Sequence, residues 1–381
     1  MQLNIVSVKI LMCKKGDGKD SMTMTSKERF ITALDKKIPD RVPIFEFPFS
    51  QKLQEIIIGY RTSLYDGEAV VKMADKLGID GVPVFLGGYC GVEFFETEDE
   101  RYTDDWGILY ERKGWPITSQ IKNPVSGRKE WETYKLPDPG QNWRFKQLTD
   151  AIKANSAEKA IISCIRGPVS FMSWFLMSID KLSIAFVDDP ALVDSICNSF
   201  INWSLDLAGR AAGIKGFDAF LIADDWGMSK SLLISPAYLR RFFIGPYKKL
   251  VEGIKCMGFP VIMHNDGNIW EVLDDIAAIG VDAYHPVEKA ATMDLKTVKQ
   301  RYKGILCPIG NIDNKGILVS GSVEDVKKET LRCLREGSEN GGYIISSDHS
   351  LHDDMPVENV IAYTDTVRKY GRYYNGKLRL E

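Results

Sequence analysis

The sequence has few of the features that mark secreted, nucleic-acid-binding or membrane-spanning proteins. Its seven cysteines are odd in number and widely spaced, with no CxxC pair, which favours reduced thiols over a disulfide framework. Lysine and arginine total 49 against 52 acidic residues, so no basic excess points to nucleic acid or to an acidic membrane surface. No apolar run reaches the roughly 18 residues of a membrane span. We therefore expect a cytoplasmic protein.

The N-terminal residues do not share the pattern of the rest of the chain. A short apolar stretch precedes a segment rich in Lys, Gly and Asp, which reverses the order found in a signal peptide, and a small-residue cleavage site is lacking. We expect residues 1–23 to be a disordered tail or an over-extended start, with the true start at Met22 or Met24.

From residue 24 onward, short apolar runs alternate with amphipathic helical stretches. The eight runs are Val42–Phe47, Gly81–Phe85, Ala160–Arg166, Ala219–Trp226, Pro260–Asp266, Ala283–Glu288, Leu306–Ile312 and Tyr343–His349. Nearly continuous apolar runs are typical of parallel strands buried on both faces. Helices are expected at Ala237–Met257, Trp270–Ile279, Val323–Gly337 and Pro356–Tyr370. Eight such units predict a single (β/α)₈ barrel over residues 24–378, and the lack of a GxGxxG turn disfavours a dinucleotide-binding fold.

One segment interrupts this alternation. Residues 87–140 contain two expected hairpin strands, Ile108–Lys113 and Ile117–Ile121, and we interpret them as an insertion after the second strand that lies over the barrel mouth. The segment is rich in aromatic residues, namely Tyr102, Trp106, Tyr110, Trp115 and Trp131. These side chains either line a substrate pocket or pack the insertion onto the barrel.

The histidines suggest where the site lies. The chain has four, all at or after residue 264, and three of them fall at or near the ends of predicted strands, where the sites of this fold sit. Residues two apart in a strand point to one side, so His264 and Asp266 face a common centre that His349 can reach. Two imidazoles and a carboxylate suit zinc or another divalent metal. The alternative is a polar cluster without a metal.

Other polar residues at strand ends are candidates for proton transfer or substrate binding. Asp224 and Asp225 are candidate bases or hydrogen-bond acceptors, or else helix caps, and Glu46 in an aromatic setting is a candidate acid or base, or else a structural carboxylate. We expect four more residues to bind substrate at the mouth: Trp226, His285, Glu288 and Asn311.

Several motifs together resemble the uroporphyrinogen decarboxylase superfamily over roughly residues 24–373. They are Lys27-Glu28-Arg29-Phe30, Pro39-Asp40-Arg41-Val42-Pro43, Leu233-Ile234-Ser235-Pro236, His264-Asn265-Asp266-Gly267-Asn268, Ile309-Gly310-Asn311-Ile312, Gly341-Gly342-Tyr343-Ile344 and Pro356-Val357-Glu358-Asn359. The resemblance implies a (β/α)₈ barrel. It also implies one of two activities: cofactor-free decarboxylation of uroporphyrinogen, or corrinoid-dependent methyl transfer, usually through zinc.

The chain departs from the decarboxylase pattern at the first two strands. Where those enzymes hold substrate carboxylates with arginines, this chain has Phe45-Glu46-Phe47-Pro48-Phe49-Ser50-Gln51, and its second strand ends without an acid at Val84-Phe85-Leu86-Gly87-Gly88. Only His349 has a clear counterpart there. An aromatic mouth that carries an acid is a poor place for a polyanion.

The methyltransferase branch is similar to this chain in another way. Its His-x-Cys zinc ligands fall on His264-Asn265-Asp266, and its last Cys falls on His349. A His/Asp/His site suits activation of an ether or alcohol oxygen. The leading hypothesis is therefore a methyltransferase that moves a methyl group between a small methylated compound, expected to be an O-methyl one, and a cobalamin-carrying partner protein. The alternatives are a uroporphyrinogen decarboxylase and a non-catalytic tetrapyrrole-binding barrel.

Overall fold

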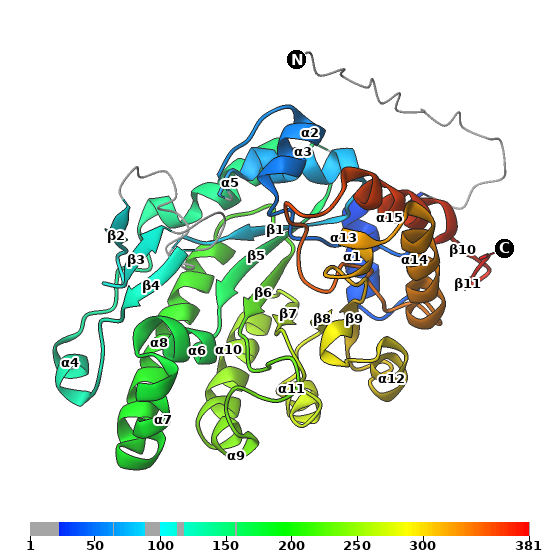
Figure 1. The fold of residues 1–381 in the computed structure, drawn as a ribbon. Coiled ribbons are helices and arrows are strands. Elements are labelled where there is room, and N and C mark those ends of the chain that lie inside the picture. Colours follow the sequence, from blue (N-terminus) through cyan, green and yellow to red (C-terminus); the bar gives the residue numbers. More distant parts are fainter. Residues whose placement is uncertain (1–22, 64, 88–99, 113–117, 157, 381) are drawn as a thin grey trace.

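Six parallel strands form the central sheet of the structure, a computed structural model that describes residues 23–63, 65–87, 100–112, 118–156 and 158–380 (Figure 1). In spatial order they are β1 Gly81–Phe85, β5 Ala160–Arg166, β6 Ala219–Ala223, β7 Val261–His264, β8 Ala283–Val287 and β9 Cys307–Gly310. Every residue of these strands is buried. Burial on both faces accounts for the apolar runs in the sequence.

Two further segments close this curled sheet into a ring. Residues 42–48 pair with β1 and with residues 343–351, which in turn pair with β9. The parallel bridges are Phe45 with Gly81, Ile44 with Ile345, Pro48 with Leu351, Ile309 with Ile344 and Ile312 with Ser347. The predicted (β/α)₈ barrel is therefore confirmed, with six regular strands and two bridged segments.

The two closing segments are not regular strands because their backbone donors are partly missing or used elsewhere. Pro43 has no N–H to give to a ladder. The N–H of Ile44 donates to the carboxylate of Asp80 at 2.8 Å, and the N–H of Ser347 donates to Glu46 at 2.6 Å. Carboxylates thus replace backbone carbonyls at the seam of the barrel.

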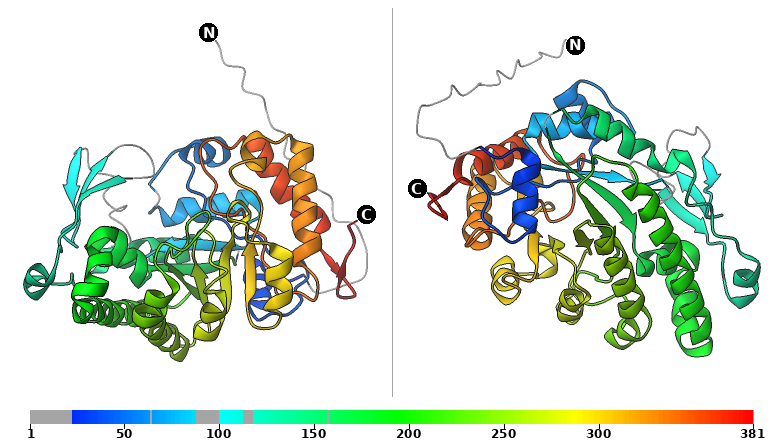
Figure 2. Two further views of the ribbon diagram at one scale, coloured as in Figure 1. Left: turned by 60° about the horizontal axis from the view of Figure 1, so that its bottom comes forward. Right: turned by 180° about the vertical axis from the view of Figure 1, so that it is seen from behind.

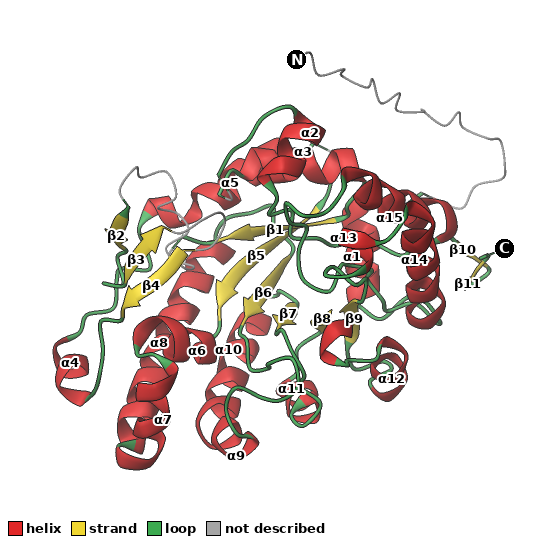
Figure 3. Cartoon of the chain, in the orientation of Figure 1, coloured by secondary structure: helices red, strands yellow, loops and turns green. Residues whose placement is uncertain are grey.

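Helices lie outside the ring, most of them around its outer side and the others at one end of it or in the segment after β1 (Figures 2 and 3). They are α1 Ser26–Leu34, α2 Gln51–Ile58, α3 Gly67–Leu77, α4 Arg128–Thr133, α5 Lys146–Ala154, α6 Pro168–Ser170, α7 Ile179–Asp188, α8 Pro190–Ala212, α9 Pro236–Tyr238, α10 Ile244–Cys256, α11 Leu273–Ile279, α12 Leu295–Arg301, α13 Ile317–Ser320, α14 Val323–Gly337 and α15 Val357–Tyr370. The helix predicted at 237–257 is present as α9 and α10 joined by a π-helical stretch, and α14 has the predicted bounds.

The buried apolar residues form two separate cores on the two sides of the barrel wall. The larger lies between the strands and the surrounding helices. The smaller fills the interior of the barrel with alternate residues of the strands, among them Ile162, Leu221 and Ile262. Phe30 of α1 belongs to this inner core and lies against Gly81, where a Cβ atom would come within 2.4 Å of its ring. One end of the barrel is thus filled, and polar residues gather at the other.

The segment after β1 contains a three-stranded antiparallel sheet at the side of the barrel (Figure 3). Its strands are β2 Arg101–Thr103, β3 Leu109–Arg112 and β4 Thr118–Lys122. The predicted hairpin corresponds to β3 and β4, and β2 was not anticipated. Trp106 is buried against Phe171 and Trp203, so this aromatic residue packs the segment onto the barrel.

Some expectations fall on residues that the structure does not describe. The expected N-terminal tail lies outside the described part except for Thr23, and so does Trp115. Within the described part, no single helix is long and apolar enough to cross a membrane. One bent pair, Pro168–Leu176 with Ile179–Asp188, satisfies length and composition together across a bend of 111°. The remaining strands, β10 Tyr373–Tyr374 and β11 Lys377–Leu378, form a small hairpin near the C-terminus.

Candidate metal centre

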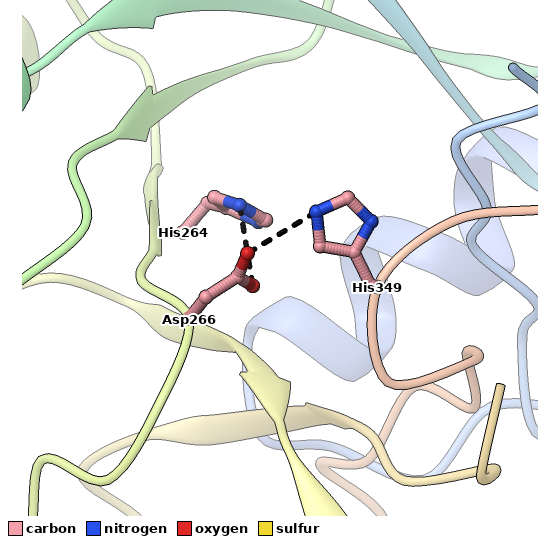
Figure 4. A group of neighbouring side chains, drawn as sticks. All are labelled: His264, Asp266 and His349. Atoms are coloured by element: carbon pink, nitrogen blue, oxygen red, sulfur yellow. Dashed lines mark ion pairs between the residues drawn. The ribbon is translucent and has the colours of Figure 1, made fainter. Parts of the chain in front are cut away.

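Three predicted ligands meet at the open end of the barrel. His264 is the last residue of β7, Asp266 follows it by two positions, and His349 belongs to the closing segment 343–351 (Figure 4). The carboxylate lies between the two rings: Oδ2 of Asp266 is 3.1 Å from Nε2 of His349, and Oδ1 is 3.6 Å from Nε2 of His264. One ligand atom from each residue lies within 4.8 Å of the other two. This spacing fits a single cation bound by all three.

The carboxylate of Asp266 carries unused hydrogen-bonding capacity. Its Oδ1 atom is buried and receives no hydrogen bond from the described residues. Burial opposes ionisation of Asp266, but His349 and His264 hold its pKa well below the usual range. Burial likewise opposes protonation of His349, yet the Asp266 carboxylate raises the pKa of that ring to about 9. Without a metal, a proton on His349 balances the charge of Asp266.

His285 lies directly behind the cluster, within the barrel. It is the register partner of His264 across β7 and β8, and the Nδ1 atoms of the two rings are 2.7 Å apart. Its side chain is fully buried, so the expected contact with substrate is not possible in this arrangement. Burial and the neighbouring His264 lower the pKa of His285 well below its ordinary value, which keeps the ring neutral.

The two adjacent aspartates after β6 have different environments. Asp225 faces the cluster, with Oδ1 3.9 Å from Nε2 of His264 and its side chain 44% exposed. Asp224 is fully buried and accepts hydrogen bonds from the backbone N–H of Ser170 at 2.6 Å, that of Val169 at 3.2 Å and the indole of Trp226 at 2.7 Å. The structure thus brings Asp225 to the site, whereas Asp224 holds the loop after β5, as a cap does.

Glu46 is not part of the cluster. Its neighbours Phe45 and Phe47 point into the barrel, where their rings pack edge-on against His285 and His264. Because side chains alternate along the segment, Glu46 points outward. It accepts hydrogen bonds from the N–H and the hydroxyl of Ser347. Burial raises the pKa of Glu46 to about 7, but the group lies on the helix side of the wall, away from any substrate at the mouth.

The other expected substrate-binding residues are engaged in the surrounding structure. Trp226 is fully buried, and its ring packs against Tyr247 of α10. The amide of Asn311 donates to the carbonyl of Val287 at 2.7 Å and is also buried. Glu288 accepts the N–H of Gly267 at 2.7 Å and so holds the turn that follows Asp266. These side chains support the loops of the mouth.

Lys315 is a residue that the sequence reasoning missed. Its ammonium group pairs with Glu288 at 2.9 Å, and Asp266 and Asp348 lie within electrostatic range. The side chain is 64% exposed. Lys315 follows Asn311 in the loop after β9. A basic residue in a loop that follows a strand could have marked Lys315 as a candidate from the sequence alone, because the sites of this fold lie at these loops. It is a positive charge beside a group of carboxylates at the mouth.

An aromatic wall adjoins the cluster. The ring of Phe47 packs against His264 and, with centroids 6.0 Å apart, stacks on Phe85 at the end of β1; Phe49 packs against both phenylalanines. Phe85 also borders a cavity of about 950 Å³ between α3 and α5. The centre therefore has polar ligands on one side and an apolar surface on the other.

Comparison with known proteins identifies the family. A family model described as Uroporphyrinogen decarboxylase (URO-D) matches residues 110–370, which is more than half of the chain. The chain belongs to the uroporphyrinogen decarboxylase family. The resemblance predicted from the motifs is therefore confirmed.

Named members of the family are distant in sequence. The chain is 23% identical to the uroporphyrinogen decarboxylase of Pseudoalteromonas atlantica over 288 residues, which cover 71% of this chain and 75% of that protein. It is also 23% identical to that of Wigglesworthia glossinidia brevipalpis, over 68% of this chain and 72% of that protein. A solved methyltransferase from Methanosarcina mazei has the same fold, with a TM-score of 0.71 and 20% identity, over 91% of this chain and 98% of that one.

Proposed function

We propose that this family member is a corrinoid-dependent methyltransferase with a metal centre at His264, Asp266 and His349. It would move a methyl group between a small methylated compound, most simply an O-methyl one, and a cobalamin carried by a partner protein. The observation that carries the proposal is the convergence of three ligand atoms within 4.8 Å around a buried carboxylate oxygen that has no hydrogen-bond donor among the described residues.

The donor set fits zinc. Two imidazoles and one carboxylate are a common arrangement in zinc sites that keep a fourth position for a ligand, and other divalent metals accept the same set. His349 and Asp266 form an ion pair, so a cation would take the place of the proton on the ring. A bound zinc ion would supply Lewis-acid polarisation of the oxygen that carries or loses the methyl group.

The remaining residues of the mouth would orient the substrate and manage charge. Asp225 is the exposed carboxylate nearest to the ligands and is placed to hold or move a proton at the reacting oxygen. Burial and Asp266 raise the pKa of Asp225 above its ordinary value, which favours a protonated form. Phe47 and Phe85 would contact the apolar part of the methyl donor and limit the access of water.

Uroporphyrinogen decarboxylation is the second candidate, because the curated relatives carry that name. Phe45 and Phe47 occupy the interior of the barrel in the segment that those enzymes use for arginines. This apolar segment offers no cation to pair with a substrate that has many carboxylates. These features favour a small, uncharged methyl donor.

The test is a comparison of two reactions with the purified protein. Incubation with cob(I)alamin and an O-methyl donor, methanol or a methoxybenzene, should convert the cob(I)alamin spectrum to that of methylcobalamin, and His349→Ala should abolish the change. Decarboxylation of uroporphyrinogen without a corrinoid would instead support the second candidate. Binding of cobalamin with neither reaction, and unaffected by His349→Ala, would indicate a non-catalytic tetrapyrrole-binding barrel.

A further inference from the structure

His264 and His285 form a pair whose hydrogen-bond polarity can be worked out. Their Nδ1 atoms are 2.7 Å apart, and two nitrogen atoms at that distance share one hydrogen, so one ring donates and the other accepts. The rings lie nearly parallel, at 26°, with centroids 4.9 Å apart. The Nε2 atom of His264 faces the carboxylates of Asp266 and Asp225. The state of one ring therefore dictates that of the other.

The surroundings of His285 fix its ring. Phe45 and Phe47 pack edge-on against it, with centroids 5.2 and 5.5 Å away, and the side chain is fully buried. The Nε2 atom of His285 lies 3.4 Å from the hydroxyl of Ser346, a group that can donate or accept. His285 thus has a hydrogen-bonding partner at each ring nitrogen, and neither partner is a carboxylate.

We propose that His285 is a positioning residue that sets the ring orientation and tautomer of His264 for metal binding. The inference rests on the metal site proposed above. A metal-bound Nε2 atom of His264 must present a lone pair, so its hydrogen resides on Nδ1 and is donated to Nδ1 of His285. His285 then carries its own hydrogen on Nε2 and donates it to Ser346. Metal-bound histidines usually donate to a carboxylate or a carbonyl, and here a neutral imidazole takes that place.

The metal-free protein should hold the opposite arrangement. Without a cation, the carboxylates of Asp266 and Asp225 favour a hydrogen on Nε2 of His264, whose Nδ1 atom then accepts from Nδ1 of His285, while Ser346 donates to the far nitrogen. On metal binding, the Nε2 hydrogen of His264 leaves to solvent and the shared hydrogen moves from His285 to His264. To keep the balance, His285 takes up one hydrogen from solvent on Nε2, the nitrogen beside the hydroxyl of Ser346. Two ring hydrogens are present before and after, so both rings stay neutral.

The experiment combines nitrogen NMR of the histidine rings with zinc titration of the full chain. In the wild type, we expect His264 to carry its hydrogen on Nε2 without zinc and on Nδ1 with zinc, with His285 changing in the opposite sense. His285→Phe keeps a ring of similar shape without an acceptor and should weaken zinc binding about 10- to 100-fold. His285→Asn offers an amide oxygen near the position of Nδ1 and should restore affinity to within about threefold of the wild type. Melting curves establish that each variant is folded.

The outcomes separate this inference from the proposed function. Zinc binding by His285→Phe with wild-type affinity, or a zinc-bound His264 without a hydrogen on Nδ1, would overturn the role of His285 and leave the metal site standing. Failure of the wild type to bind zinc would contradict the proposed site. In that case, the tautomers of the metal-free protein would still test the role of His285. If the two rings carry complementary tautomers in the wild type and His264 becomes a mixture of tautomers in His285→Phe, His285 sets the tautomer of His264. Tautomers of His264 unaffected by the substitution would overturn it.

Discussion

Glu46 and Phe47 are neighbours in the chain, but their side chains point to opposite sides of the barrel wall. Phe47 packs against His264 inside the barrel, with ring centroids 5.6 Å apart, whereas Glu46 accepts two hydrogen bonds from Ser347 on the helix side, beside Tyr363 of α15. Through these hydrogen bonds, the outward-pointing carboxylate of Glu46 joins the two closing segments of the barrel. Its position also makes the protonation state of Glu46 a determinant of stability.

Glu46→Gln should therefore change the pH dependence of stability. Burial raises the pKa of Glu46 from 4.5 to about 7 in the folded protein, with Asp348 adding to the rise. The folded state keeps the proton that the unfolded state loses, so wild-type stability should fall as pH rises from about 4.5 to about 7 and then level off. Glutamine does not ionise. At pH 8 the variant should be more stable by about 1–3 kcal/mol, and at pH 4 the two proteins should be similar.

Chemical denaturation at both pH values measures this difference. Glu252→Gln, an exposed carboxylate on α10, is the matched control and should follow the wild-type curve. A Glu46→Gln variant that loses stability equally at pH 4 and pH 8 would mean that the pKa of Glu46 is the same in the folded and unfolded states.

Asp224 and Asp225 should respond differently to the same substitution. Asp224→Asn places an amide N–H₂ among three donors, those of Val169, Ser170 and Trp226, and should reduce the free energy of unfolding by about 1–3 kcal/mol. Asp225→Asn should cost much less because that side chain is 44% exposed. Urea denaturation of the two variants measures their free energies of unfolding. Equal decreases in the two variants would argue against the structural role of Asp224.

Gly81 should not tolerate a side chain. A Cβ atom there would come within 2.4 Å of the ring of Phe30, which is enclosed in the inner core, so Gly81→Ala should destabilise the protein by about 1–3 kcal/mol. At Gly209, within α8, the nearest atom outside the helix to such a Cβ would be the methyl carbon of Met257 at 3.8 Å, an ordinary contact. Gly209→Ala should therefore be neutral or stabilise by up to about 1 kcal/mol. Phe30→Leu has a smaller side chain at the contact. Adding it to Gly81→Ala should therefore partly restore the melting temperature in thermal denaturation.

The barrel was predictable because parallel strands buried on both faces leave a long-range pattern in the sequence. The same burial hides which way each side chain points. Phe45, Glu46 and Phe47 read as one apolar run with an acid in it, and both sides of the wall are apolar, so the sequence could not place Glu46 on the outer side. For the same reason, the sequence could not show which of the adjacent Asp224 and Asp225 faces the site.

The clustering of the three candidate ligands was predictable because strand ends converge at one edge of a barrel, whatever the loops between them. The spacing of His264 and Asp266 placed them on one side, and His349 was within reach across the mouth. Residues that act through loop packing were not accessible to this reasoning. Lys315 reaches Glu288 only through the path of the loop after β9, and His285 is buried behind His264 because the register of β7 and β8 aligns them.

The most direct test of the account is the zinc content of the purified protein. Elemental analysis should find about one zinc per chain in the wild type, and none in His264→Ala or in His349→Ala, with each variant still folded. His352→Ala is the matched control, because His352 bonds to the carbonyl of Asn314 at 3.1 Å and lies outside the cluster. This variant should keep its zinc. A wild-type protein that holds no metal after zinc is supplied, or ligand variants that retain it, would contradict the central claim.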